Sequence, residues 1–147
     1  MREILLLMVL LFLLVGCSDV PNSDHSRETE IIEDVYITEI ERFNTDWNHI
    51  QFPVNFSENV LKEIGPIDTN QDAVYIGTDI IEALHKEGKW LEYTLVSIAR
   101  STEDDVWRFE YAIDQRVVDI DNLIDCGCLY VAIDGNEGIL IKAWLEE

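Results

Sequence analysis

Hydrophobic side chains recur at helical spacing in one segment of the chain, which covers about residues 70–87. The later hydrophobic residues of this segment lie three, seven, ten and eleven positions after the first one. At about 3.6 residues per turn, these positions form one stripe on the surface of a helix. These apolar positions are Ala73, Ile76, Ile80, Ala83 and Leu84. Residues 68–72 offer helix-capping and acidic side chains, and Gly88 suits the position just after a helix. We predict a helix here, with its stripe in the core.

The pattern after residue 90 is typical of strands. Residues 106–113 alternate, with Trp107, Phe109, Tyr111 and Ile113 on one face and Arg108, Glu110 and Ala112 on the other. Residues 90–100 are rich in strand-forming side chains and are followed by the polar turn 101–105. Residues 128–134 and 139–147 flank a Gly-containing turn and predict a final hairpin. Residues 115–125 form an acidic loop that could include a short edge strand.

A helix with one apolar stripe must cover a sheet with one apolar face. We therefore expect an α+β fold, with one long helix packed on a curved four-stranded antiparallel sheet. The segment 35–64 is less clear, because residues 35–43 fit either a strand or a short helix. Its bulky apolar residues must also be buried, and residues 59–64 suggest a short helical turn before Gly65-Pro66.

The N-terminal residues 1–16 are typical of an export signal. The unbroken apolar run Ile4–Val15 is shorter than the ~20 residues that a membrane-spanning helix needs. Leu14-Val15-Gly16-Cys17 resembles the lipobox of bacterial lipoproteins. That resemblance implies cleavage between Gly16 and Cys17 and a lipid on Cys17. The protein would then be anchored in the cell membrane, facing the extracellular or periplasmic side. An ordinary secretory signal with a chance cysteine is the alternative.

Charge and length set the domain organisation. The chain has 147 residues, with 30 acidic and 10 basic side chains and a net charge of −20. This charge disfavours binding to nucleic acid and electrostatic binding to anionic lipid. The polar, acidic residues 17–34 are interpreted as a flexible tether. Residues 35–147 have the length of a single α+β domain.

The order of elements over residues 65–147 resembles two groups of bacterial proteins. One is the small immunity-type proteins of the cystatin-like and nuclear-transport-factor-like superfold, which implies a cystatin-like roll that binds or neutralises a partner. The other is the PepSY-like domains, which implies restraint of an exported peptidase or wall-associated process. Neither group has a universal catalytic set. The residues that carry the resemblance are Ala73, Ile76, Ile80, Asp105-Val106-Trp107, Tyr130–Gly135 and Gly138.

Cys126 and Cys128 are the most suggestive chemical pair. Only His49 and His85 remain in the domain as further soft ligands, and neither has ligand spacing to the pair. A redox dithiol usually has two intervening residues, whereas this pair has one. We interpret them as two partly buried thiols. A strained or regulatory disulfide and a metal site are the alternatives.

No other motif predicts catalysis or a cofactor. Asp119, Asp121 and Asp125 suggest calcium, but Leu123 and Ile124 occupy places where a calcium loop needs an oxygen ligand and a glycine. The oxygen-rich residues 134–138 are explained by a hairpin turn. Nucleophile-elbow, zinc-protease and phosphate-loop motifs are absent from the sequence. We therefore expect neither enzymatic activity nor a resident metal or cofactor.

Acidity is the remaining indication of function. Residues 101–125 hold eight acidic and two basic side chains, a density that can attract a basic partner. We expect a non-catalytic binding or inhibitor/immunity module for a basic protein or peptide. The alternative is a structural or accessory envelope lipoprotein with no soluble partner. The expected contact residues are Glu103, Asp104, Asp105, Asp119, Asp121 and Asp125.

Overall fold

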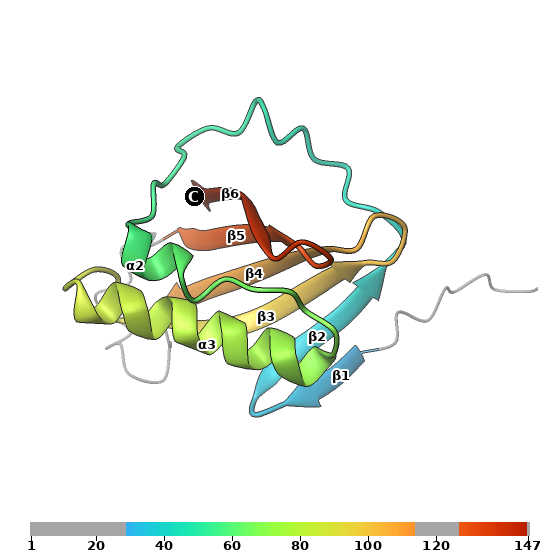
Figure 1. Ribbon diagram of the computed structural model, residues 1–147, viewed down its shortest axis with the longest axis horizontal. Helices are drawn as coiled ribbons and strands as arrows, with labels where there is room; N and C mark the ends of the chain where they lie inside the picture. The colour runs from blue at the N-terminus through green and yellow to red at the C-terminus, as the bar shows by residue number, and fades with distance from the viewer. Residues whose placement is uncertain (1–28, 114–126, 147) are drawn as a thin grey trace, which may run out of the picture.

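The computed structural model describes residues 29–113 and 127–146 of the chain. In this part, six strands form one sheet in the order β1-β2-β3-β4-β5-β6, and two helices lie on one of its faces (Figure 1). The elements are β1 (Thr29–Ile32), β2 (Val35–Ile40), α2 (Glu58–Leu61), α3 (Asn70–Lys86), β3 (Tyr93–Ser101), β4 (Val106–Ile113), β5 (Cys128–Asp134) and β6 (Ile139–Glu146). No helix in these ranges has the length and apolar character needed to cross a bilayer.

The sheet is mixed, and this corrects one sequence-based expectation. β2 pairs with β3 in parallel, whereas all the other neighbouring strands are antiparallel. The chain leaves β2, passes through both helices and returns as β3, which is the long crossover that a parallel pair requires. The expected four-stranded antiparallel sheet of a cystatin-like roll is therefore wrong. Only the general α+β class holds.

The two strands that the sequence does not predict are β1 and β2. β2 lies in a segment that fits either a strand or a helix, and β1 lies in the segment interpreted as a tether. Residues 35–40 form a strand, with Val35 and Ile37 buried and Tyr36 exposed. β1 includes the end of the segment 17–34 that was interpreted as a tether. Its residues are largely exposed, so they show little of the apolar alternation that reveals a strand. Pairing with β2 defines β1 instead.

Helix α3 confirms the strongest sequence prediction, and its ends have specific causes. The Thr69 side chain accepts a hydrogen bond from the Asp72 backbone N–H at 3.1 Å, and the Asp72 carboxylate accepts one from the Thr69 N–H at 3.0 Å. This reciprocal capping box starts the helix. At the other end Gly88 has φ +72°. The N–H groups of Gly88 and Lys89 bond back to the carbonyls of His85 and Leu84, which forms a Schellman motif.

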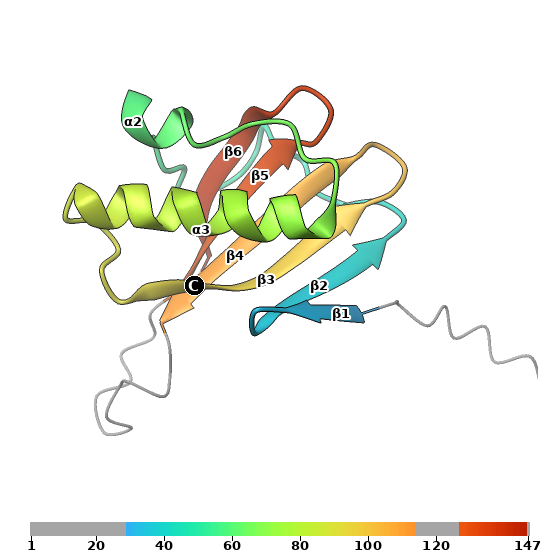
Figure 2. The same ribbon diagram turned by 60° about the horizontal axis from the view of Figure 1, so that its bottom comes forward.

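Helix α3 lies across β3 and β4 at very close range (Figure 2). The Tyr111 hydroxyl on β4 donates a hydrogen bond to the Gly77 carbonyl at 2.9 Å, and both residues are buried. A Cβ atom at position 77 would lie 2.7 Å from Leu95 and 2.8 Å from Phe109. The helix can approach the sheet this closely because position 77 has no side chain. The main core lies in this layer, around Ile80, Leu84, Trp107, Phe109 and Tyr111.

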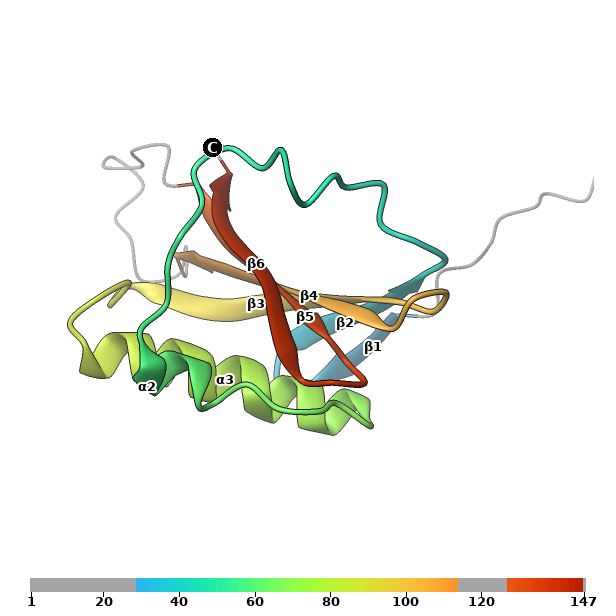
Figure 3. The same ribbon diagram turned by 45° about the horizontal axis from the view of Figure 1, so that its top comes forward.

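Residues 41–57, which we name the strap, cross the opposite face of the sheet. Figure 3 shows this segment on the far side of the sheet from α3, before it turns around β6 towards α2. The Val54 N–H donates to the Ala143 carbonyl at 2.8 Å, and the Leu145 N–H donates to the Phe52 carbonyl at 3.1 Å. These two bonds attach the strap to the edge of β6. A second apolar cluster lies beneath it, built on Phe43 and Trp144.

Candidate functional site

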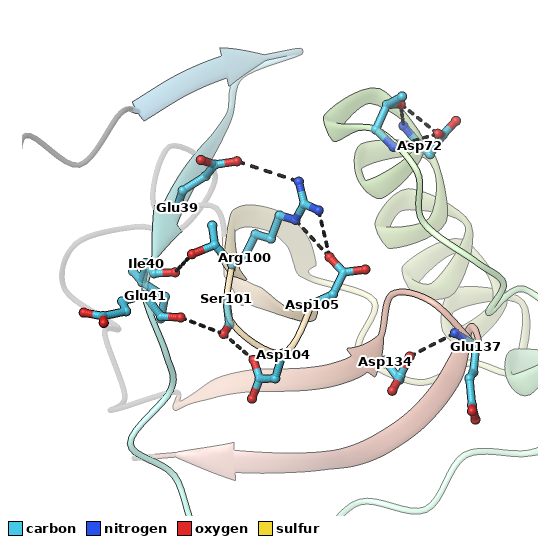
Figure 4. A network of polar contacts seen from close by, with 12 residues as sticks. Glu39, Ile40, Glu41, Asp72, Arg100, Ser101, Asp104, Asp105, Asp134 and Glu137 are labelled. Carbon is cyan, nitrogen blue, oxygen red and sulfur yellow. Dashed lines mark hydrogen bonds and ion pairs between the residues drawn. The ribbon is translucent and has the colours of Figure 1, made fainter.

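Five carboxylates gather at one end of the sheet, and we name them the acidic rim: Glu39 in β2, Glu41 directly after it, and Glu103, Asp104 and Asp105 in the β3–β4 turn. Figure 4 labels all of them except Glu103. The parallel pairing creates this cluster. Ile40 at the end of β2 lies opposite Ser101 at the end of β3, where the turn begins. If β2 and β3 were antiparallel, their C-terminal ends would lie at opposite ends of the two strands.

Hydrogen bonds hold the two parts of the rim together. The Thr102 N–H donates to the Ile40 carbonyl at 2.9 Å, and the Glu103 N–H donates to the Glu41 carbonyl at 3.1 Å. The fully buried Ser101 hydroxyl also donates to the Glu41 carbonyl at 3.1 Å, and it bonds the Asp104 carboxylate. The acidic side chains are therefore presented from an ordered backbone.

Asp105 differs from its neighbours because it has a cationic partner. The Arg100 Nε and Nη2 atoms donate to its Oδ1 at 3.0 Å and 2.9 Å. The Arg100 guanidinium also lies 4.9 Å from the ring centroid of Trp107 and 3.8 Å from Glu39. The Asp105 side chain is only 22 % exposed. Asp105 therefore stabilises the turn, and the exposed acids of the rim are Glu41, Glu103 and Asp104.

The remaining expected contact residues belong to the segment between β4 and β5. Asp119, Asp121 and Asp125 lie outside the described residues. The segment that contains them leaves β4 at Ile113, whereas the β3–β4 turn enters β4 at Val106. The two parts of the expected contact surface are thus attached at opposite ends of β4.

Only one residue of the cysteine pair is described, and the lipobox lies outside the described residues. Cys126, Gly16 and Cys17 lie outside the described residues, whereas Cys128 begins β5 and is partly buried. Burial, followed by the nearby Glu110 carboxylate, raises the pKa of the Cys128 thiol. The thiol is the less nucleophilic form, so this environment opposes redox chemistry at neutral pH.

Metal binding finds no support in the described geometry. Among residues 29–113 and 127–146, no group of three or more His, Cys, Asp or Glu side chains could hold an ion. Asp134 in the β5–β6 turn instead accepts a hydrogen bond from the Glu137 N–H at 2.9 Å. Its carboxylate therefore stabilises the hairpin turn that the sequence predicts.

The sequence did not indicate a second feature, which is a hollow beneath the strap. Arg108, expected on the polar face of β4, has its guanidinium carbon 5.0 Å from the ring centroid of Phe43 and 5.4 Å from that of Tyr130. Next to it is a hollow of about 490 Å³, whose lining includes Phe52 and Trp144. The aromatic residues of segment 41–57 were the available indication, because they need a surface to cover.

Comparison with protein-family models, with curated proteins and with solved structures finds no match to this chain.

Proposed function

We propose that this chain is a lipid-anchored cell-envelope protein whose folded part is a non-catalytic binding module for a basic protein or peptide. The acidic rim is the observation that carries this proposal. It concentrates exposed carboxylates on two adjacent, hydrogen-bonded segments of one sheet end. Such a surface favours a cationic partner and repels an acidic one.

Most charges of the rim are not neutralised by other described residues. Arg100 contacts Asp105 and approaches Glu39, which leaves Glu41, Glu103 and Asp104 without a described ion pair. The net charge of −20 adds a long-range field of the same sign. Exposed charges of this kind act mainly on the rate of encounter, over a Debye length of about 10 Å at 0.1 M salt.

The lipid anchor supports the same function by placing the module at a membrane surface. Between Cys17 and Thr29 lie enough residues to reach about 40 Å when fully extended. A tether of that reach would present the rim to a partner in the envelope. Two acyl chains on Cys17 provide stable anchoring, whereas a single chain does not.

The rim is tested by neutralising its exposed acids. We expect the triple variant Glu41→Gln, Glu103→Gln, Asp104→Asn to slow association with an oligolysine peptide several-fold at low salt, with little change in dissociation. The matched control neutralises Asp79, Glu82 and Glu92, which are also exposed but lie away from the rim. Equal association rates for the two variants would show that only the total charge matters.

The anchor is tested by mass spectrometry of the mature protein. We expect the mature protein to begin with an acylated Cys17. We expect Cys17→Ser to abolish the lipid, so that the variant no longer partitions into the detergent phase. A mature chain that begins at another residue, or that lacks a lipid, would contradict the lipobox interpretation and leave the rim experiment unaffected.

A further inference from the structure

Arg108 is a cation that has no anionic partner among the described residues of this acidic protein. Arg100, the other arginine of the described strands, bonds Asp105 and approaches Glu39. By contrast, the Arg108 side chain forms no ion pair or hydrogen bond with another described residue. Its contacts are with the rings of Phe43 and Tyr130. Ring contacts of this kind leave the N–H donors of a guanidinium available to a ligand.

The hollow that Arg108 lines has the size and chemistry of a small-molecule site. Its volume of about 490 Å³ lies within the usual range for ligand pockets. Ile50, Phe52, Trp144 and Leu145 supply apolar lining from the strap and β6, whereas Thr45 and Gln51 add polar groups. Arg108 is the only cationic residue that lines it among the described residues.

Phe52 provides an independent indication of a binding role. Phe52 lines this hollow and is 60 % exposed, although burial of a phenyl ring is favourable. Its backbone has φ +54°, a conformation that is strained for a bulky residue. The hydrogen bond from the Leu145 N–H to the Phe52 carbonyl maintains this position. Backbone strain, which is concentrated at functional sites, therefore coincides here with an exposed aromatic side chain.

We propose that this hollow binds a small organic anion that carries one carboxylate on an apolar body. The carboxylate would accept paired hydrogen bonds from Arg108, since the planar guanidinium matches its geometry. The apolar body would lie against Phe52 and Trp144. A single negative charge fits better than a phosphate dianion, because Glu146 also lines the hollow and Glu110 follows Arg108 on the same face of β4.

The chemistry is tested with matched probes in isothermal titration calorimetry. Phenylacetate is compared with phenylacetamide, which has the same shape without the charge, and with acetate, which lacks the ring. We expect phenylacetate to bind at least tenfold more tightly than either. Comparison of N-acetylphenylalanine with phenylacetate then distinguishes a peptide carboxyl terminus from a simple organic acid, and N-acetylphenylalanine amide is the uncharged control. Equal binding of phenylacetate and phenylacetamide, or no binding of any probe, would overturn the proposal.

The role of Arg108 is tested with variants that differ in charge and geometry. We expect Arg108→Gln to weaken phenylacetate binding at least tenfold and Arg108→Lys to weaken it less. Lys62→Gln, which removes an exposed charge on the other side of the sheet, should have no effect. Phe52→Ala removes an exposed ring, so it should weaken binding without lowering the melting temperature, even if Arg108→Gln disturbs the strap. Wild-type binding by both Arg108→Gln and Phe52→Ala would overturn the assignment, whatever the outcome at the acidic rim.

Discussion

Substitution of Gly77 by alanine tests the close contact between α3 and the sheet. Two effects of opposite sign compete at this position. Alanine favours a helix interior by about 1 kcal/mol relative to glycine. The new Cβ atom, however, would lie 2.7 Å from Leu95 Cδ2 and 2.8 Å from Phe109 Cδ1. The Leu95 methyl group can rotate away, but the Phe109 ring is completely buried.

The steric effect should exceed the gain in helix propensity. Overpacking of a core typically costs about 1–3 kcal/mol. A helix pushed away from β4 would also lengthen the hydrogen bond from Tyr111 to the Gly77 carbonyl. Leaving that buried hydroxyl unpaired costs about 1–3 kcal/mol if the bond is lost completely. We therefore expect Gly77→Ala to lower the free energy of unfolding by about 1–3 kcal/mol.

Urea denaturation of the chain expressed from Ser18 measures this change. Asp79→Ala is the control, because it alters propensity on the exposed face of the same helix and should be neutral or slightly stabilising. In a Tyr111→Phe background, Gly77→Ala should cost less, because the two positions are coupled. A Gly77→Ala protein as stable as the wild type would refute the close-approach argument.

Two further predictions concern packing and pH. Ile80→Asp should cost several kcal/mol because it buries an unpaired charge, whereas Glu82→Lys on the exposed face should change stability by less than about 0.5 kcal/mol; equal melting temperatures would contradict the helix packing. The Ser57 hydroxyl, followed by Lys89, holds the pKa of Glu87 below its usual range. A lowered folded-state pKa means that this contribution to stability is present above the unfolded pKa and is lost as pH falls through the folded pKa. Ser57→Ala should raise the Glu87 pKa in an NMR titration, and an unchanged titration would exclude the contact.

Local elements could be predicted because their causes lie close together in the sequence. Helix α3 depends on a capping box that spans the four residues 69–72 and on an apolar stripe within one segment. The strands β3 to β6 depend on strand-forming and alternating side chains, and on the short turns that join β3 to β4 and β5 to β6. The acids of the β3–β4 turn were also identified as a candidate surface. The structure then separates Asp105, which Arg100 neutralises, from the exposed Glu103 and Asp104.

Non-local pairings could not be read from the same patterns. Ile37 lies opposite Ile98 in the parallel pair, although the whole crossover separates them along the chain. An edge strand such as β1, whose side chains are mostly exposed, has no apolar alternation to detect. The strap was equally hidden, because aromatic residues in an irregular segment show that burial is needed without showing which surface is covered.

By itself, the sequence determined the α+β class, the limits of α3, the last hairpin and the acidic character of the chain. These properties follow from the composition and from the hydrophobic periodicity within single helices and strands. Only the tertiary structure decided the non-local contacts, such as the pairing of β2 with β3 and the path of the strap, and both candidate sites depend on them. The acidic rim exists because parallel pairing brings Glu41 beside Glu103. The Arg108 hollow exists because the strap crosses the second face of β4. Both contacts are selected by the free energy of the complete sheet, so no single segment encodes them.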